Sequence, residues 1–301
     1  MDAVLGDVIA QQSIMWSPDF MGNGHGVVTE GAFAYWPLIA PCGDSNSTFL
    51  HRSLTNPPPT SRTPPSLYTD EQVNQFVAAE SLREHTFHVD PTFESTHGAG
   101  HNWVGGCMAD NQMSPADPVF WLYHAFIDCI WEIMRENQME NGIDVEKDYP
   151  VDDIALGVGQ ETVRGSEDIL TDSTQSYHYP YNPLGALRPL RNIDGLSKEY
   201  TDNFYRYAPR PTCSPDKPSC GSKYLFCETS IHKCAPKLQL GATCGPFRTY
   251  DPINDGPCMN GYCCDDGFCR SQCDSLGSVA GDLGSVVGGL GSVTGDNDKH
   301  W

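Results

Sequence analysis

The chain has 301 residues, of which 39% are hydrophobic and 19% are charged, so its composition excludes a largely disordered or collagen-like protein. Acidic residues outnumber basic ones by 39 to 18, and the formal net charge is −21. Phosphate binding requires a basic surface, so no nucleic acid partner is expected. No stretch reaches the roughly 20 apolar residues that a membrane-spanning helix needs, so no membrane partner is expected either.

Three regions differ in composition and are predicted to be separate units. Residues 1–210 mix aromatic side chains, histidines and helical patterns with Pro-rich loops, and residues 211–274 are rich in cysteine. Residues 275–301 hold three copies of a Gly-rich unit, LGSVAGD, LGSVVGG and LGSVTGD, which cannot bury much surface and favours a disordered tail. The predicted fold is mainly α-helical, with long loops, a small disulfide-rich module and a flexible tail.

The segment FESTHGAGHNWVGG, residues 93–106, places His97 and His101 four residues apart. On a helix these side chains share one face with Cβ atoms about 5–6 Å apart, which suits two imidazoles on one metal ion. A pair of surface histidines on a loop is the alternative, because Gly98 and Gly100 disfavour an isolated helix. A zinc protease is excluded, since its HExxH motif needs a carboxylate where Gly98 stands.

The clearest helix is expected over residues 118–138. Asp117 is suited to cap its N-terminus, and Pro118 at the first helical position has no N–H to leave unpaired. Apolar residues cover nearly the whole circumference, which predicts a helix buried in the middle of its domain. His124 and Asp128 on such a helix therefore need polar partners.

His124 is the candidate that would complete a metal site with His97 and His101. Neutral imidazoles suit zinc, copper, iron or nickel, so ligand type alone leaves the metal open. Cys107 follows the Gly-Gly turn, and Cys129 lies on the helix that carries His124. Either the two cysteines form a disulfide that joins the turn to the helix, or both are buried free thiols. Cys42 has no evident partner.

Ten of the thirteen cysteines lie between Cys213 and Cys273. So many thiols with few aliphatic residues indicate a disulfide framework formed in an oxidising compartment. A zinc module is the weaker alternative, because the segment lacks paired Cys-x-x-Cys spacings and has one histidine, His232. We therefore expect a secreted protein, although residues 1–20 contain no Lys or Arg and no long apolar run that would serve as an export signal.

Two segments, HGAGHNWVGGCM at 97–108 and SPADPVFWLYHAFIDCIW at 114–131, carry a longer pattern. The pattern is His-x-x-x-His, a Trp-x-Gly-Gly turn, Asp-Pro-x-Phe-x-x-x-His, and an Asp four residues on. It resembles the second copper-binding region of tyrosinases, catechol oxidases and molluscan haemocyanins. Residues 14–40 resemble, more loosely, the linker between that family's two copper sites. Residues 205–227 resemble the start of the cysteine-rich extension of molluscan shell tyrosinase-like proteins.

This resemblance implies that His97, His101 and His124 are the three ligands of the second copper in a dinuclear centre. Such a centre binds dioxygen between two copper ions and oxidises o-diphenols to o-quinones. The implied substrates are phenolic or catecholic small molecules, or tyrosyl and DOPA side chains, with dioxygen as the oxidant. The family usually has His-His where this chain has Tyr123 followed by His124.

Two carboxylates acquire candidate roles from the same resemblance. Asp128 is a candidate to support a ligand from one turn along the helix, with a structural hydrogen bond as the alternative. Glu94 occupies a position where related sequences carry a carboxylate suggested to hold a water near the substrate proton, so it is the candidate catalytic residue. The family's Asn after the first ligand is Gly98 here, which favours diphenol oxidation over monophenol hydroxylation.

The family's first copper site needs three further histidines, and this chain begins almost at the linker. The histidines nearest in sequence, His25, His51, His85 and His88, lie in linker-like or Pro-rich contexts and outside that pattern. We therefore expect the second copper site alone, with an apolar face of helix 118–138 left exposed. The hypothesis is that Met1 is an internal start, in a truncated gene model or a shortened paralogue, which also explains the missing export signal.

Two other functions are open. A non-enzymatic, acidic matrix protein of shell or cuticle would keep the same fold remnant, charge and repeat tail without catalysis. A haemocyanin-like oxygen carrier is disfavoured, because that family follows the site with a β-sandwich rather than a cysteine-rich module. The copper content of the chain distinguishes the half-site, at one ion, from the matrix protein, at none.

Overall fold

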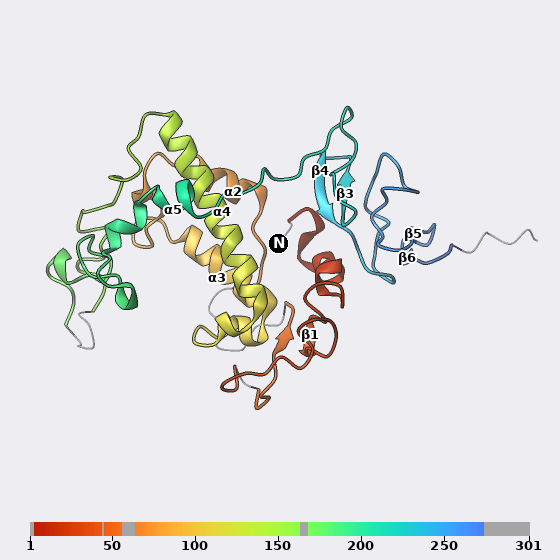
Figure 1. Ribbon diagram of the computed structural model, residues 1–301, viewed down its shortest axis with the longest axis horizontal. Helices are drawn as coiled ribbons and strands as arrows, with labels where there is room; N and C mark the ends of the chain where they lie inside the picture. The colour runs from red at the N-terminus through yellow and green to blue at the C-terminus, as the bar shows by residue number, and fades with distance from the viewer. Residues whose placement is uncertain (1–2, 44, 56–63, 163–167, 274–301) are drawn as a thin grey trace, which may run out of the picture.

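The computed structural model describes residues 3–43, 45–55, 64–162 and 168–273 (Figure 1). The tail predicted over 275–301 lies outside these residues. The described α-helices are α1 (Gly6–Ile9), α2 (Asp70–Val77), α3 (Thr92–Val104), α4 (Pro118–Glu140) and α5 (Glu199–Asn203). The described strands form two-stranded antiparallel sheets, which are β1 (His25–Val27) with β2 (His51–Ser53), β3 (Leu225–Glu228) with β4 (Lys233–Pro236), and β5 (Tyr262–Cys263) with β6 (Cys269–Arg270).

Helix α4 begins where its sequence predicts. The Asp117 carboxylate accepts a hydrogen bond from the Val119 N–H, and Pro118 occupies the first turn. The helix ends at Glu140, two residues beyond the expected end. Between α4 and α5 the described chain has turns, isolated bridges and short 3-10 helices. The helical content is therefore lower than the mainly α-helical prediction implies.

Burial divides α4 into two faces. Tyr123, Ile130 and Met134 are at most 4% exposed, whereas Trp121 is 64% and Leu122 48% exposed. The expectation that this helix is buried all round is therefore wrong, because one side has no packing partner among the described residues. The expectation that an apolar face of the helix stays exposed is confirmed.

The cysteine-rich region is a framework of short strands and disulfides, as predicted. All ten of its cysteines are paired, as Cys213–Cys227, Cys220–Cys234, Cys244–Cys263, Cys258–Cys269 and Cys264–Cys273. Cys227 and Cys234 also face each other across the β3–β4 ladder. The zinc alternative is therefore excluded for these thiols, because a disulfide sulfur is not a thiolate ligand.

Cys42 and Cys107 form a sixth disulfide, and Cys129 is the free cysteine of the described chain. Two predictions are corrected by this pair. Cys107 does not bridge to Cys129, which lies half-buried on α4, and Cys42 is not an orphan. The bridge joins the loop before β2 to the 3-10 turn after α3, across 65 residues.

The N-terminal segment and the cysteine-rich region lie side by side (Figure 1). Ile14 N–H donates to the Lys237 carbonyl at 2.9 Å, and the Gln239 N–H donates to the Gln12 carbonyl at 2.9 Å. One hydrophobic cluster contains residues from both regions, including Trp16, Trp103 and Leu238. The predicted disulfide module is thus packed onto the rest of the chain rather than tethered to it.

Among the described residues, the helices are all too short or too polar to cross a membrane.

Candidate metal site

Helices α3 and α4 bring the three predicted ligands together. His97 and His101 lie one turn apart on α3, and His124 reaches them from the first half of α4. The Nε2 atoms are 3.1 Å apart for His97 and His101, 3.4 Å for His97 and His124, and 3.3 Å for His101 and His124. Three ligand atoms about 2.0 Å from one tetrahedral metal ion would lie about 3.3 Å apart, so the spacing fits a metal ion.

The hydrogen bonds on the far side of two rings fix which nitrogen faces the centre. His101 Nδ1 lies 3.0 Å from the Met108 carbonyl and therefore carries a proton to donate. His97 Nδ1 lies 3.5 Å from the Glu94 carboxylate, which favours the same tautomer. Each of these rings then presents an Nε2 lone pair to the centre. Lone pairs that converge without donors repel one another, so the donor set fits a bound cation.

Burial favours the neutral form of two of the three histidines, and metal ligands must be neutral. Burial, together with the nearby rings of His97 and His124, lowers the pKa of His101 to about 4, although its bond to Met108 opposes the shift. Burial also lowers the pKa of His124, with His97 adding to the effect. The hydrogen bond with His97 lowers the pKa of Glu94, so this carboxylate is ionised at neutral pH.

Tyr123 and Gly100 set the contact between the two helices. The buried Tyr123 Oη donates to the His97 carbonyl at 2.9 Å, which joins α4 to the helix that carries two ligands. A Cβ at position 100 would lie 2.1 Å from that Oη, so Gly100 is required for the approach. The glycine that weakens an isolated helix is thus needed in the folded one. The sequence marked Tyr123 as a departure from the family pattern, but its bond to α3 was not foreseen.

The Gly-Gly turn after α3 packs against β2. Gly105 and Gly106 have φ angles of 66° and 52°, and a Cβ on either would lie 2.3 Å from the carbonyl oxygen of Ser53 or His51. Only glycine combines this backbone conformation with such a close approach. The turn delivers the Met108 carbonyl to His101, so β2 supports the orientation of that ligand.

The same strand holds the N-terminus of α4 through a buried ion pair. Arg52 on β2 donates from Nε and Nη2 to both carboxylate oxygens of Asp117, each at 2.8 Å, and both side chains are fully buried. Arg52 Nη1 also donates to the Met21 carbonyl at 2.7 Å. Because Asp117 caps α4, this arginine helps to position His124. Arg52 was not foreseen from the sequence, where its only signal is a leucine two residues to either side, at Leu50 and Leu54.

The two carboxylates with predicted roles are placed differently. Glu94 contacts His97 at Nδ1, the ring nitrogen that faces away from the three converging Nε2 atoms, so it orients a candidate ligand. A role in holding water near a substrate stays a prediction. Asp128 accepts a hydrogen bond from Tyr207 Oη at 2.5 Å, which ties the segment after α5 to α4. Burial and Asp128 raise the pKa of Tyr207.

Four other histidines lie apart from the cluster, and three of them contact other groups. His85 Nε2 lies 3.0 Å from the Phe76 carbonyl, and His88 Nε2 lies 2.8 Å from Glu161. His51 Nδ1 lies 3.7 Å from both sulfurs of the Cys42–Cys107 bridge, and His25 is exposed on β1. In the described parts of the chain, the one group of three histidines with converging ligand atoms is His97, His101 and His124.

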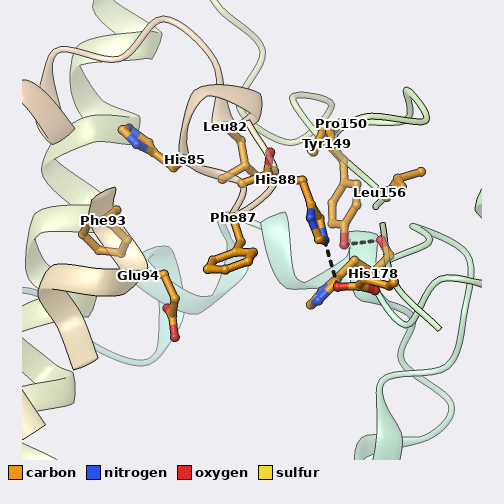
Figure 2. Close-up of a pocket in the computed structure, with 13 residues that line it drawn as sticks. Leu82, His85, Phe87, His88, Phe93, Glu94, Tyr149, Pro150, Leu156 and His178 are labelled. Atoms are coloured by element: carbon orange, nitrogen blue, oxygen red, sulfur yellow. Dashed lines mark hydrogen bonds and ion pairs between the residues drawn. The ribbon is translucent and has the colours of Figure 1, made fainter. Parts of the chain in front are cut away.

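A cavity of about 550 Å³ lies beside the cluster, at the N-terminal end of α3 (Figure 2). Glu94 belongs to its lining and also contacts His97. Across the cavity, the loop after α4 contributes Tyr149, Pro150 and Leu156. Figure 2 shows Phe87 between Glu94 and His88.

Comparisons with known proteins point to one family. Residues 7–137 match the family model described as the common central domain of tyrosinase, a range that contains all three histidines. The chain is 30% identical over 268 residues to the tyrosinase-like protein tyr-3 of Caenorhabditis elegans, a match covering 84% of this chain and 34% of the relative.

Relatives in molluscs and bacteria also carry tyrosinase names. A tyrosinase-like protein of Pinctada maxima is 32% identical over 214 residues, which are 67% of this chain and 42% of the relative. A tyrosinase of Streptomyces lincolnensis is 34% identical over 137 residues, which are 40% of this chain and 47% of the relative. The chain therefore spans less than half the length of each of these relatives.

Proposed function

Because this chain belongs to the tyrosinase family through residues 7–137, we propose that it takes part in the copper-dependent oxidation of o-diphenols to o-quinones by dioxygen. The observation that carries the proposal is the convergence of three histidine Nε2 atoms within 3.1–3.4 Å of one another. Copper, when bound, supplies the redox chemistry. The residues supply its binding site, its access and the orientation of its ligands.

Each residue has a specific part in this proposal. His97, His101 and His124 hold one copper ion as neutral ligands. Glu94 accepts a hydrogen bond from His97 Nδ1 and the Met108 carbonyl accepts one from His101 Nδ1, which keeps the Nε2 lone pairs on the metal. These contacts also raise the basicity of the imidazoles and so strengthen metal binding.

We propose that the described chain holds the second site of the dinuclear centre and not the first. The support is that His25, His51, His85 and His88 engage other partners or stand alone, and do not gather into a second cluster. The exposed apolar face of α4 at Trp121 and Leu122 is where further helices could pack. On this proposal the isolated chain binds one copper ion and turns over diphenols slowly or not at all.

The proposed location is extracellular, and the proposed substrates are small catechols or tyrosyl and DOPA side chains. The paired cysteines of residues 213–273 support an oxidising compartment. We also propose boundaries near residues 211 and 275 for the disulfide-rich module and the repeat tail. A shell or cuticle matrix would suit both the acidic charge and an oxidase that crosslinks its surroundings.

The test is copper stoichiometry, followed by oxidation of a simple catechol. We expect one copper ion per chain, lost in the His124→Ala variant. Two ions per chain would contradict the half-site proposal, and no bound copper would favour the non-enzymatic matrix protein. Rapid catechol oxidation by the chain alone, measured as quinone absorbance, would contradict the proposal that the chain holds only one of the two copper sites.

A further inference from the structure

The Cys42–Cys107 disulfide lies beside a histidine that the proposed function does not use. His51 Nδ1 is 3.7 Å from the sulfur of each cysteine. The three side chains come from separate parts of the chain, which are the loop before β2, strand β2 itself and the 3-10 turn after α3. Among the described groups in which disulfide sulfurs gather at ligand distance, this is the one that includes a histidine.

The position of His51 matches the geometry of a shared metal ion. A tetrahedral zinc ion, bound at about 2.3 Å by sulfur and about 2.0 Å by nitrogen, places these two atoms about 3.6 Å apart. Both nitrogen–sulfur distances are already close to this value. Two sulfurs on the same ion would lie about 3.8 Å apart. The bonded sulfurs are closer than that, so the S–S bond must break before the three atoms can share an ion.

Contacts other than the disulfide also hold the three segments together. The Gly43 N–H donates to the Asp110 carboxylate at 2.9 Å, which joins the residue after Cys42 to the segment just after Cys107. The ladder with β1 fixes the backbone of His51. The arrangement of the three side chains therefore does not depend on the S–S bond alone.

The surroundings favour bonds between thiolates and a metal ion. Both cysteines are fully buried and pack with Val28 and Leu50 in a small apolar cluster. Burial lowers the pKa of His51, although a hydrogen bond to the Phe49 backbone and the charge of Asp117 oppose the shift. The neutral ring has a lone pair to offer. Thiolates in such an apolar shell need a cation to compensate their charge.

We propose that reduction of the Cys42–Cys107 disulfide turns this cluster into a binding site for a thiophilic cation such as zinc. Two glutathione molecules supply two electrons and two protons, which breaks the S–S bond, forms two cysteine thiols and leaves glutathione disulfide. The ion then replaces the two thiol protons and binds both sulfurs and His51 Nδ1, with water as the fourth ligand. The reverse reaction with glutathione disulfide re-forms the bond and releases the ion. This site goes beyond the proposed oxidase activity, which uses the three-histidine cluster.

The test measures how zinc shifts the reduction of this one disulfide. The chain is equilibrated in glutathione redox buffers with and without a fixed concentration of free zinc, quenched with acid, and alkylated in denaturant. Mass spectrometry of the peptides then gives the state of each cysteine. Because zinc binds the reduced form of the site, it should lower the ratio of glutathione squared to glutathione disulfide at half-reduction by about tenfold or more. No zinc-dependent shift at Cys42–Cys107 would overturn the proposal.

Variants distinguish this site from zinc binding to any pair of thiols. His51→Ala removes the nitrogen ligand, and His51→Phe keeps a flat ring without one, so both should lose most of the zinc-dependent shift. His25→Ala, at an exposed histidine of β1, is the matched control and should keep it. Each shift is measured within one variant, so any effect of the substitution on the bridge itself cancels. Zinc at the three-histidine cluster affects these variants alike, and the oxidase assay has no bearing on the result. Shifts of equal size in all of them would mean that two thiols suffice, and would refute the site.

Discussion

The metal-site region and the cysteine-rich region position their side chains by different means. In the first, α3 and α4 are held by buried long-range contacts, such as Arg52 with Asp117 across 65 residues. In the second, strands of two to four residues are held by five disulfides, each spanning 9 to 19 residues. Helix packing therefore holds the metal-site region in place, and disulfides hold the cysteine-rich region in place.

Because of this difference, each region should be destabilised by a different kind of change. A buried contact fails when one partner is replaced, because the other partner is left unsatisfied in a dry environment. A disulfide framework fails when its bonds are reduced, because the unfolded chain regains its freedom. Changes in one region should therefore have their largest effects on readouts specific to that region.

The largest expected effect is on copper binding. His124→Ala leaves two of three ligands, so copper affinity should fall by more than the roughly 10–100-fold that loss of an outer-shell partner causes. Equilibrium dialysis against a competing chelator measures the change. His25→Ala, at an exposed histidine of β1, is the matched control and should bind copper like the unmodified chain. Native affinity in His124→Ala would rule out the site.

The buried ion pair should be the most sensitive point for stability of the metal-site region. Arg52→Met leaves Asp117 charged and buried, which should lower the free energy of unfolding by about 3–5 kcal/mol. Urea unfolding followed by near-UV circular dichroism gives the value. Arg83→Met breaks the exposed pair with Asp152, and should lower the free energy of unfolding far less than Arg52→Met does. Similar losses in the two variants would contradict the role assigned to Arg52.

Removal of one disulfide should destabilise the cysteine-rich region and spare the metal site. The bridge Cys220–Cys234 spans 14 residues, so replacing both cysteines with serine should cost about 3 kcal/mol. Limited proteolysis should then cleave near residues 220–234, while copper stoichiometry stays the same. Loss of copper binding in this variant would show that the two regions depend on each other.

Acid should weaken the metal-free site region through His101. Its pKa is about 4 in the folded chain and near 6.5 when unfolded, so the unfolded state binds more protons between these values. The free energy of unfolding should therefore fall as the pH is lowered from about 6.5 toward 4. Denaturation at a series of pH values measures the slope. His101→Gln should flatten it, and an unchanged slope would show that other groups cause the acid sensitivity.

The smallest effect is expected at the contact between the helices. Tyr123→Phe removes the hydrogen bond to the His97 carbonyl, which should cost about 1 kcal/mol. The electronic spectrum of cobalt bound at the site should also shift, because the helix that carries His97 gains freedom relative to α4. Tyr250→Phe, at an exposed tyrosine of the cysteine-rich region, should leave that spectrum unchanged.

The sequence was sufficient to single out the three histidines that the structure brings together, because their pattern is local. The spacing of His97 and His101, and the cap and proline before His124, depend on residues within a few helical turns. The resemblance to a copper-binding region then joined the two segments. The disulfide framework was also predictable, since ten cysteines in 61 residues exceed what a core of that size would use.

The supporting contacts were not predictable, because they join residues far apart in the chain. Arg52 lies on a strand of three residues, too short to give an alternating pattern, and its partner is 65 residues away. The Cys42–Cys107 pairing has the same separation, and the nearer Cys129 was the natural candidate. Burial of α4 was overestimated because apolar residues do not reveal whether a neighbouring element is present to cover them.

The hydrogen bonds between the N-terminal segment and the cysteine-rich region have a consequence for biosynthesis. Gln239 donates to the Trp16 carbonyl from 223 residues further along the chain. At roughly 5–20 residues per second, a ribosome would need about 10–45 s to make that interval. The Trp16 carbonyl would lack this hydrogen bond for that time, while α3 and α4 could already pair. During synthesis, the helices that carry the three histidines could therefore pack before the cysteine-rich region joins the N-terminal segment.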